Sequence, residues 1–351
     1  MAEKAQLTVE ALPLRTRHVF GLSRGAEQVF ENLEVRIQYQ GLVGLGEIAP
    51  SAYYGERAAI SREGARIFWE VAEGRVPAIV QADDPTSELI ALQKAWDSAL
   101  RRNGAARAGL DMALWDLWGK AKGRSVNPLW SGGSLNCPGT SYTIAIGLPE
   151  TLPSRLEASR GFEFLKVKVG GPGDAETLRE IRKLDSRPIR VDANCAWRGR
   201  EAVEQLRPLV GFGIEMIEQP CPPRDLEGLD AVRREFGIPV FADESAETLE
   251  DVDAVQGRVD GINVKLVKCG GPTAARQYIQ RAQELGLQVM LGCMIESSVA
   301  IAAAVHLAPL AGRIDLDGSL LLDKDPFVGV EWLDGRPRLP QGPGLGVIGR
   351  G

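Results

Sequence analysis

The chain has 351 residues, of which 44% are hydrophobic and 25% are charged, the composition of an ordinary globular protein rather than of a disordered, collagenous or membrane chain. Its 41 basic and 47 acidic residues give a net charge of −6 with a pI near 5.3, so it offers no basic footprint for nucleic acid. This length corresponds to about two domains of ~150 residues each, or to one large barrel with an addition.

Both the N-terminus and the cysteines favour a cytoplasmic location. Residues 1–4 lead into mixed polar sequence, so we expect no signal peptide, and the apolar stretch 297–312 is shorter than the ~18 to 20 residues of a membrane span. Five scattered cysteines without a CxxC pair indicate reduced thiols. We expect no membrane partner, and the sequence leaves both a monomer and a homo-oligomer open.

The first third of the chain predicts an α+β domain over residues 1–130. Segments 8–12 and 34–39 alternate apolar and polar residues with period two, which is typical of antiparallel strands. From residue 56 to 122 the periodicity becomes helical, and residues 105–122 place an apolar face on one helix. The residues of that face are Leu110, Ala113, Leu114, Leu117 and Trp118.

Beyond a Gly/Ser/Pro-rich stretch at 131–139, short apolar strands alternate with amphipathic helical segments, as in repeated βα units. The eight predicted strands are 141–146, 164–169, 189–191, 214–218, 240–242, 261–265, 288–291 and 313–315. Seven landmarks near the strand ends follow one another at intervals of 22 to 28 residues. These landmarks are Lys168, Asp192, Glu218, Asp243, Lys265, Cys293 and Asp315.

Eight parallel strands with this spacing predict an α/β fold, a modified TIM (β/α)8 barrel over residues 131–321. The active site of such a barrel lies at the C-terminal ends of its strands, so every landmark is expected on one rim. The N-terminal α+β capping domain is then completed by the C-terminal segment, residues 322–351, which returns to it.

Three consecutive strands each deliver one carboxylate to this rim: Asp192, Glu218 and Asp243. Three negative charges in a partly desolvated site repel one another unless protons or a cation neutralise them. Ligation by oxygen alone, without His or Cys, points to Mg²⁺. The alternative is that each acid caps the helix that follows it.

Lysines on two strands suggest proton transfer. Lys166 and Lys168 are two residues apart on one strand, so they point to the same side, and Lys265 ends a strand on the opposite wall of the barrel. An inward-facing lysine near other cations shifts toward its neutral form, which suits a base near neutral pH. The alternative for Lys166 and Lys168 is a solvent-facing pair on an edge strand.

Histidine and serine supply a rival hypothesis. Residues 21–25 match GxSxG, so a serine hydrolase using Ser23 and His306 is the remote alternative. The motif precedes the parallel-strand region instead of lying within it, and His306 falls in an alanine-rich helical run, where a structural role is expected.

Five short motifs together resemble the enolase superfamily and its muconate-lactonizing subgroup. They are Lys166-Val167-Lys168, Val191-Asp192-Ala193-Asn194, Glu218-Gln219-Pro220, Ala242-Asp243-Glu244-Ser245 and Asn263-Val264-Lys265. The resemblance implies Mg²⁺ held by the three acids, and proton transfer through an enediolate by Lys168 and Lys265. It implies that Lys166 assists near the substrate carboxylate, and we include Asn194 and Glu244 as supports for the metal ligands.

Within the superfamily, Asp315 and Asp317 resemble the dipeptide epimerase pattern, in which two acids hold the α-ammonium of a dipeptide. That resemblance implies 1,1-proton transfer at the α-carbon of the C-terminal residue. It also implies a specificity loop over residues 18–28, where Arg24 would pair with an acidic side chain, as in L-Ala-L/D-Glu. The other expected substrate contacts are Thr143, Cys293, Met294 and Ile295.

Related activities remain as alternatives: N-acylamino acid racemase, o-succinylbenzoate synthase and muconate cycloisomerase. Their substrates lack the free ammonium that Asp315 and Asp317 would bind. A non-enzymatic barrel would be expected to lack at least one catalytic group, and none is missing from this sequence.

Overall fold

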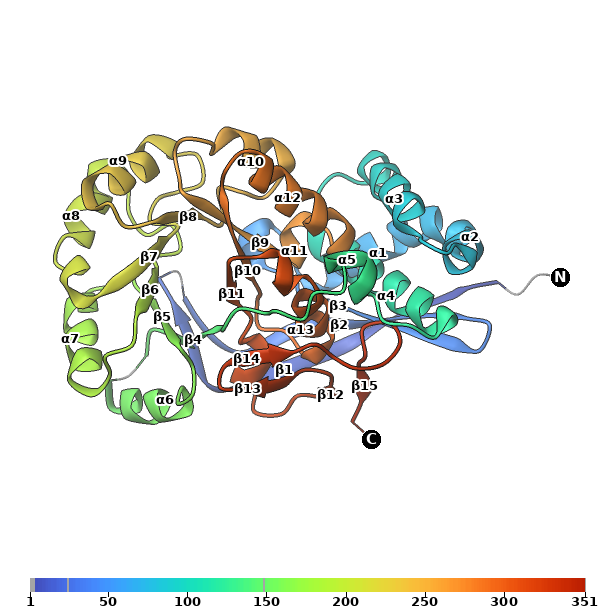
Figure 1. Ribbon diagram of the computed structural model, residues 1–351, viewed down its shortest axis with the longest axis horizontal. Helices are drawn as coiled ribbons and strands as arrows, with labels where there is room; N and C mark the ends of the chain where they lie inside the picture. The colour runs from blue at the N-terminus through green and yellow to red at the C-terminus, as the bar shows by residue number, and fades with distance from the viewer. Residues whose placement is uncertain (1–3, 24, 148, 351) are drawn as a thin grey trace.

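The computed structural model describes residues 4–23, 25–147 and 149–350. The alternating N-terminal segments form an antiparallel sheet in the order β1-β2-β3, with strands β1 (Gln6–Leu22), β2 (Gly25–Tyr39) and β3 (Leu42–Ile48). β1 and β2 are longer than the predicted segments. Their pairing begins with Gln6 opposite Gln38 and ends with Leu22 opposite Gly25. This long hairpin reaches from the helical part of the molecule toward the barrel (Figure 1).

Helices complete the part of the chain that precedes residue 132, which we call the cap. They are η1 (Ala52–Tyr54), α1 (Ala58–Ala72), η2 (Glu73–Arg75), α2 (Val76–Gln81), α3 (Thr86–Ala99), α4 (Gly104–Lys122) and α5 (Asn127–Ser131). Helix α4 is buried on all sides over residues 105–119, not on one face as predicted, because it packs between the sheet and the barrel. Gly46 allows this approach, since a Cβ there would lie 1.9 Å from the carbonyl oxygen of Gly109.

All eight predicted barrel strands are present in one parallel sheet, ordered β4 to β11. The strands are β4 (Ser141–Ile144), β5 (Phe164–Lys168), β6 (Ile189–Asp192), β7 (Ile214–Glu218), β8 (Val240–Ala242), β9 (Gly261–Lys265), β10 (Gln288–Gly292) and β11 (Arg313–Asp315). A parallel bridge between Thr140 and Ile314 joins the last strand to the first. The (β/α)8 prediction is therefore confirmed.

Helices follow the strands on the outside of the barrel (Figure 1). They are η3 (Pro149–Thr151), α6 (Leu152–Ala158), α7 (Asp174–Leu184), α8 (Gly199–Leu206), η4 (Val210–Phe212), α9 (Leu226–Phe236), α10 (Leu249–Ala254), α11 (Leu266–Cys269), α12 (Pro272–Glu284), α13 (Ser298–Leu307) and η5 (Ala308–Leu310). After β11 the chain forms η6 (Gly318–Leu321) and four short strands. These strands are β12 (Phe327–Val328), β13 (Glu331–Leu333), β14 (Arg336–Arg338) and β15 (Ile348–Gly349).

The C-terminal segment is hydrogen-bonded to the cap, both near α4 and along β1. The amide of Leu345 donates to Oδ1 of Asp116 in α4 over 2.9 Å, and Arg17 Nε of β1 donates to the carbonyl of Leu322 over 3.0 Å. Residues far apart in the sequence thus hold the cap against the barrel.

The two ends of the barrel carry different side chains. Toward the N-terminal end, Met216, Phe241 and Met290 form an apolar cluster, while the buried Arg190 guanidinium lies 4.0 Å from the centre of the Phe164 ring and pairs with Glu215. At the C-terminal end the strand pairing aligns Lys168 with Asp192 and Asp192 with Glu218. The sheet register therefore gathers the predicted charged residues at one rim.

Candidate active site

Two lysines of β5 lie inside the barrel among carboxylates. Lys168 Nζ donates to Oδ2 of Asp192 over 2.6 Å. Lys166 Nζ lies 2.7 Å from Oδ2 of Asp315, 2.7 Å from Oε2 of Glu218 and 3.1 Å from Oδ2 of Asp192. Both lysines are buried, so the structure contradicts the alternative of a solvent-facing edge pair.

Two of the acids around Lys166, Asp192 and Glu218, have pKa values shifted in opposite directions. Burial opposes ionisation of Asp192, but the ammonium groups of Lys168 and Lys166 hold the pKa of Asp192 below its usual value. Burial and the negative charge of Asp192 raise the pKa of Glu218 to about 7. The rim therefore concentrates negative charge around Glu218.

The opposite wall carries a second pair of lysines. Lys265 Nζ, at the end of β9, donates to Oδ2 of Asp243 over 2.8 Å. Lys268, on α11, donates to Oδ1 and to the carbonyl of Asp243 over 2.6 and 2.7 Å, and to the carbonyl of Asn263 over 2.7 Å. Sequence reasoning missed Lys268, although its spacing of three from Lys265 was visible.

The nearest neighbour of Lys265 favours its charged form. Burial would lower the pKa of Lys265, but the adjacent carboxylate of Asp243 raises it above its ordinary value. For Asp243, burial opposes ionisation, while Lys265 and Lys268 lower its pKa. The shift toward neutral lysine is expected for a lysine near other cations and a metal, and it stays a prediction.

Asp315 and Asp317 lie at the same rim but have different partners. Asp315 accepts from Ser141 Oγ over 2.6 Å and from Lys166, whereas Asp317 accepts the backbone amide of Thr143 over 2.6 Å. Burial and the charge of Asp315 raise the pKa of Asp317 to about 7. The structure thus brings together Thr143, Asp315 and Asp317, as expected of a cation-binding corner.

Asp192, Glu218 and Asp243 are chemically suited to hold a hard divalent cation. All three are buried, supply oxygen alone, and act electrostatically on one another. Among the described residues, no three His, Cys, Asp or Glu side chains form a ready coordination cluster, because lysine ammonium groups bind these carboxylates. Oε2 of Glu218 receives no hydrogen bond from a described residue, although Lys166 is its ion-pair partner, so this oxygen fits a ligand role.

Amide side chains hold these acids in place. Gln219 Oε1 accepts the backbone amides of Asp243 and Ser245 over 2.7 and 3.0 Å, and Asn263 Nδ2 donates to Oε1 of Glu218 over 2.8 Å. Sequence reasoning did not assign Gln219 or Asn263 a role. Each stands within a quoted motif, but a spacing pattern does not show which atom a side-chain amide will meet.

The two predicted supporting residues lie beside the acids. Asn194 donates its backbone amide to Oδ1 of Asp192 over 2.9 Å, and it adopts a left-handed backbone with φ of 46°. Glu244 is buried next to Asp243 in the sequence. Both therefore occupy positions compatible with support of the metal ligands.

The segment after β10 borders the rim. Cys293 and Met294 are half-buried and Ile295 is buried, with its carbonyl accepting from Asn32 of the cap over 2.9 Å. Burial raises the pKa of the neighbouring Glu296 to about 8, and the charge of Glu47 adds to the shift. Sequence reasoning did not select Glu296, since nothing in the local pattern indicates its burial.

The turn of the β1–β2 hairpin reaches the loop that follows β6. Ser23 Oγ donates to the carbonyls of Ala193 and Asn194 over 3.3 and 3.5 Å. The predicted contact Arg24 lies outside the described residues. His306 is buried in α13, where Nε2 lies 3.2 Å from the carbonyl of Leu345 and burial lowers its pKa to about 4, so Ser23 and His306 do not meet.

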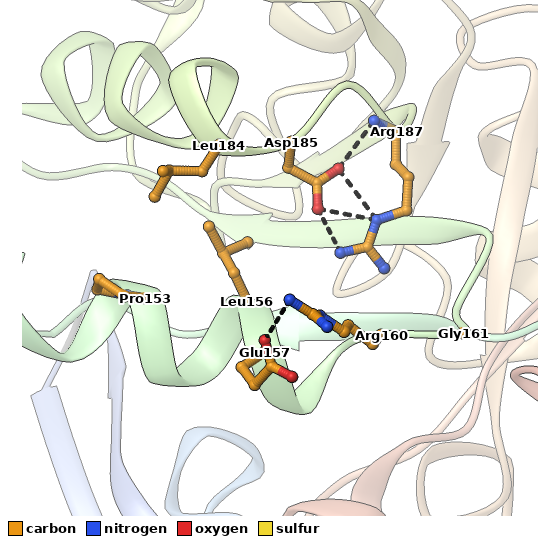
Figure 2. Close-up of a pocket in the computed structure, with 8 residues that line it drawn as sticks. All are labelled: Pro153, Leu156, Glu157, Arg160, Gly161, Leu184, Asp185 and Arg187. Carbon is orange, nitrogen blue, oxygen red and sulfur yellow. Dashed lines mark hydrogen bonds and ion pairs between the residues drawn. The ribbon is translucent and has the colours of Figure 1, made fainter.

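A cavity of about 370 Å³ lies at the other end of the barrel (Figure 2). It is bordered by the segments that lead into β5 and β6, and Figure 2 shows ion pairs of Asp185 with Arg187 and of Glu157 with Arg160 across its wall. None of the predicted site residues lines this cavity, so it stands apart from the candidate active site.

Two family models match the chain. The model of the mandelate racemase / muconate lactonizing enzyme N-terminal domain matches residues 6–130, and the enolase C-terminal domain-like model matches residues 153–348. In the described part of the chain, no helix combines the length and apolar character needed to cross a bilayer.

Similar proteins cover nearly the whole chain. It is 37% identical to the L-Ala-D/L-Glu epimerase of Bacteroides thetaiotaomicron, over 98% of this chain and 88% of that protein. It is 32% identical to the hydrophobic dipeptide epimerase of Enterococcus faecalis, over 97% and 98%. A crystal structure of the dipeptide epimerase from Enterococcus faecalis with Mg and L-Leu-L-Tyr superposes with a TM-score of 0.88 at 31% identity, over 98% and 99%.

Proposed function

Since the chain belongs to the mandelate racemase / muconate lactonizing enzyme family of the enolase superfamily, we propose that it is a Mg²⁺-dependent dipeptide epimerase. The proposed reaction is 1,1-proton transfer at the α-carbon of the C-terminal residue. The observation that supports this most is that two acids, Asp315 and Asp317, lie at the rim of a barrel whose opposite strands β5 and β9 carry buried lysines, with Lys166 of β5 paired to Asp315. Relatives and a solved structure named as dipeptide epimerases add to it.

Lys168 and Lys265 are the proposed acid/base pair. β5 and β9 are four strands apart in an eight-stranded barrel, so their side chains reach the interior from opposite sides. Each ammonium donates one hydrogen bond to one carboxylate, which leaves other donor positions for a substrate. One lysine, once deprotonated, removes the α-proton, and the other returns a proton to the opposite face, which inverts the configuration.

The carboxylates fix the two ends of the substrate. Asp315 and Asp317 bind the α-ammonium through charge-assisted hydrogen bonds, and Thr143 holds Asp317 in position. Mg²⁺ held by Asp192, Glu218 and Asp243 would stabilise the negative charge that develops on the substrate carboxylate as the α-proton leaves. Lys166 adds positive charge beside that carboxylate, while Asn194 and Glu244 support the metal ligands.

The preferred side chains are a finer proposal. The relatives are named for L-Ala-D/L-Glu and for hydrophobic dipeptides, so similarity alone favours neither class. The segment 18–28, predicted as a loop, belongs mostly to the paired ends of β1 and β2. We propose that Arg24, between these strands in the sequence, pairs with an acidic side chain as in L-Ala-L/D-Glu, because guanidinium matches carboxylate geometry. Cys293, Met294 and Ile295 would contact the peptide from the rim of β10.

The test is α-proton exchange in D₂O with Mg²⁺, followed by mass spectrometry, on L,L-dipeptides with acidic, hydrophobic and cationic C-terminal residues. We expect a mass gain of one on dipeptides, abolished by a chelator and restored by Mg²⁺. N-acylated amino acids of matched side chains are the control. Exchange on those compounds but on no dipeptide would overturn the proposal in favour of an N-acylamino acid racemase.

A further inference from the structure

One ammonium group contacts carboxylates from three strands. Lys166 Nζ of β5 lies 3.1 Å from Asp192 of β6, 2.7 Å from Glu218 of β7 and 2.7 Å from Asp315 of β11. The lysine is 1% exposed, and its three N–H groups equal the number of carboxylates around it. The ammonium group of Lys166 therefore cannot move into solvent unless the rim rearranges.

These three carboxylates belong to two different proposed sites. Asp192 and Glu218 are candidate ligands of the divalent cation, and Asp315 is a candidate partner of the substrate ammonium. A divalent cation at the first two acids repels Lys166 toward Asp315. An ammonium group at Asp315 repels it in the opposite direction, toward Asp192 and Glu218.

We infer that Lys166 couples the two sites, so that a divalent cation and an isolated ammonium ligand weaken each other's binding. The inference rests on the proposed function, because it needs both sites. When both ligands are bound, Lys166 loses its partners on both sides. By thermodynamic linkage, the factor by which the ammonium ligand weakens cation binding equals the factor by which the cation weakens ammonium binding.

The same geometry favours ligands that carry both an ammonium group and a carboxylate. Four rim lysines, Lys166, Lys168, Lys265 and Lys268, face four carboxylates in the observed ion pairs. A divalent cation adds two positive charges to this balanced set and an ammonium ligand adds a third. A dipeptide also carries a carboxylate, which can pair with Lys166. Its binding is therefore not weakened by the repulsion between positive charges that weakens the binding of a simple amine.

The probe is Mn²⁺ binding to the whole protein, measured by electron paramagnetic resonance. L-Alaninamide supplies the ammonium without a C-terminal carboxylate, and the dipeptide with the largest α-proton exchange supplies both charges. We expect saturating L-alaninamide to raise the Mn²⁺ dissociation constant at least about fivefold, the lower end of ordinary coupling, and the dipeptide not to raise it. Equal Mn²⁺ affinity with and without L-alaninamide would overturn the coupling alone, whereas failure to bind Mn²⁺ would overturn the proposed function as well.

A matched pair of variants assigns the coupling to Lys166. Lys166→Met should reduce the effect of L-alaninamide on Mn²⁺ binding to less than about twofold, and Lys166→Arg should restore part of it. Lys168→Met removes an equal charge beside Asp192 without touching Asp315, so it should keep the full effect. Loss of the effect in Lys168→Met but not in Lys166→Met would overturn the inference.

A second pair of variants serves if Lys166→Met does not fold. Asp315→Asn removes the position to which Lys166 withdraws, so it should weaken Mn²⁺ binding at least about fivefold although Asp315 is not a proposed ligand. Asp317→Asn removes a carboxylate at the same rim that forms no ion pair with Lys166. At pH 8, equal weakening by both variants would show simple charge loss and overturn the inference.

Discussion

The β5 and β9 walls of the barrel each carry two lysines, but the chain builds the two pairs differently. Lys166 and Lys168 share a side of β5 because strand residues two apart point the same way. Lys265 ends β9 and Lys268 lies three residues later on α11, so a strand-to-helix turn brings them together. The comparison teaches that one arrangement of charge can arise from two local structures.

On each wall one lysine has a single partner and the other makes three contacts. Lys168 and Lys265 each donate to one acid, whereas Lys166 contacts three acids and Lys268 makes three hydrogen bonds. A lysine with free donor positions can turn to a substrate, while one with all donors in use is fixed. This contrast separates the proposed proton carriers from the residues that hold the site.

The largest expected effect is on the proton carriers. Lys168→Ala and Lys265→Ala should each reduce kcat for epimerisation by about 10³-fold or more, because general acid/base groups contribute about 10²- to 10⁴-fold and both are needed for inversion. Each variant should still exchange the α-proton of one epimer, and the retained epimer should differ between the two. Mass spectrometry and chiral chromatography in D₂O measure both quantities.

A surface lysine provides the control for that experiment. Lys183→Ala removes an exposed lysine of α7 whose ion-pair partner within the described residues is the exposed Glu180, so full activity is expected. If Lys168→Ala and Lys265→Ala retained exchange of the same epimer, the two lysines would not act on opposite faces of the α-carbon. The proposed division of roles between the two walls would then be wrong.

The next effect concerns stability and distinguishes the fixed lysine. Lys268→Met leaves Asp243 with one ammonium partner and removes the hydrogen bonds that Lys268 donates to two carbonyls, so the free energy of unfolding should fall by about 3–5 kcal/mol. Lys168→Met should cost less, since Lys166 still lies 3.1 Å from Asp192. Urea unfolding in the presence of a chelator measures both values, and equal losses would contradict the contrast between fixed and singly bonded lysines.

A smaller effect concerns Asp317, which lies beside the β5 wall but, unlike Asp315, forms no ion pair with a described lysine or arginine. Its pKa of about 7, raised by burial and by Asp315, means that it ionises between pH 6 and 8. The ammonium form of L-alaninamide should therefore bind about tenfold more weakly at pH 6 than at pH 8, because it needs the ionised acid; its concentration is calculated from the amine pKa of about 8. Its inhibition constant measures this dependence.

The raised pKa of Asp317 makes folding stability change with pH in the direction opposite to that of L-alaninamide binding. Because the neutral form of Asp317 is favoured in the folded chain, its contribution to stability is present at acid pH and is lost as pH rises through about 7. Asp317→Asn should flatten both profiles. A variant that kept the tenfold change in L-alaninamide binding would assign that change to another group.

Much of this architecture follows from spacing in the sequence. Short apolar runs predict eight strands, and the interval of 22 to 28 residues between their ends predicts a barrel. The structure confirms the strands and the barrel, because apolar runs and their spacing are local properties. The seven landmarks near those strand ends follow from the same regularity.

Contacts between distant segments were not predictable in this way. The bonds of Lys268 to Asp243 and of Gln219 to Ser245 depend on how side chains from neighbouring strands meet, and the burial of α4 on all sides depends on the barrel beneath it. The ion pair of Lys265 with Asp243 was not predicted for the same reason, since that acid lies 22 residues away in the sequence and its charge raises the pKa of Lys265.

The smallest expected effect tests how the cap covers the two walls. On the β9 side, α4 packs so closely that a Cβ on Gly104 would lie 2.4 Å from the carbonyl oxygen of Val267. On the β5 side, cover near the rim includes two long hydrogen bonds from Ser23 to the loop after β6. Ser23→Ala should therefore raise KM by no more than about fivefold, the equivalent of one ordinary hydrogen bond, and leave kcat unchanged.

The Ser23→Ala result also bears on chemistry, because a serine nucleophile could not be replaced at so small a cost. Steady-state epimerisation at several dipeptide concentrations separates KM from kcat. A large fall in kcat would show that the hairpin turn does more than cover the site. In that case proton transfer by Lys168 on the β5 wall would depend on the cap, and proton transfer by Lys265 on the β9 wall would not.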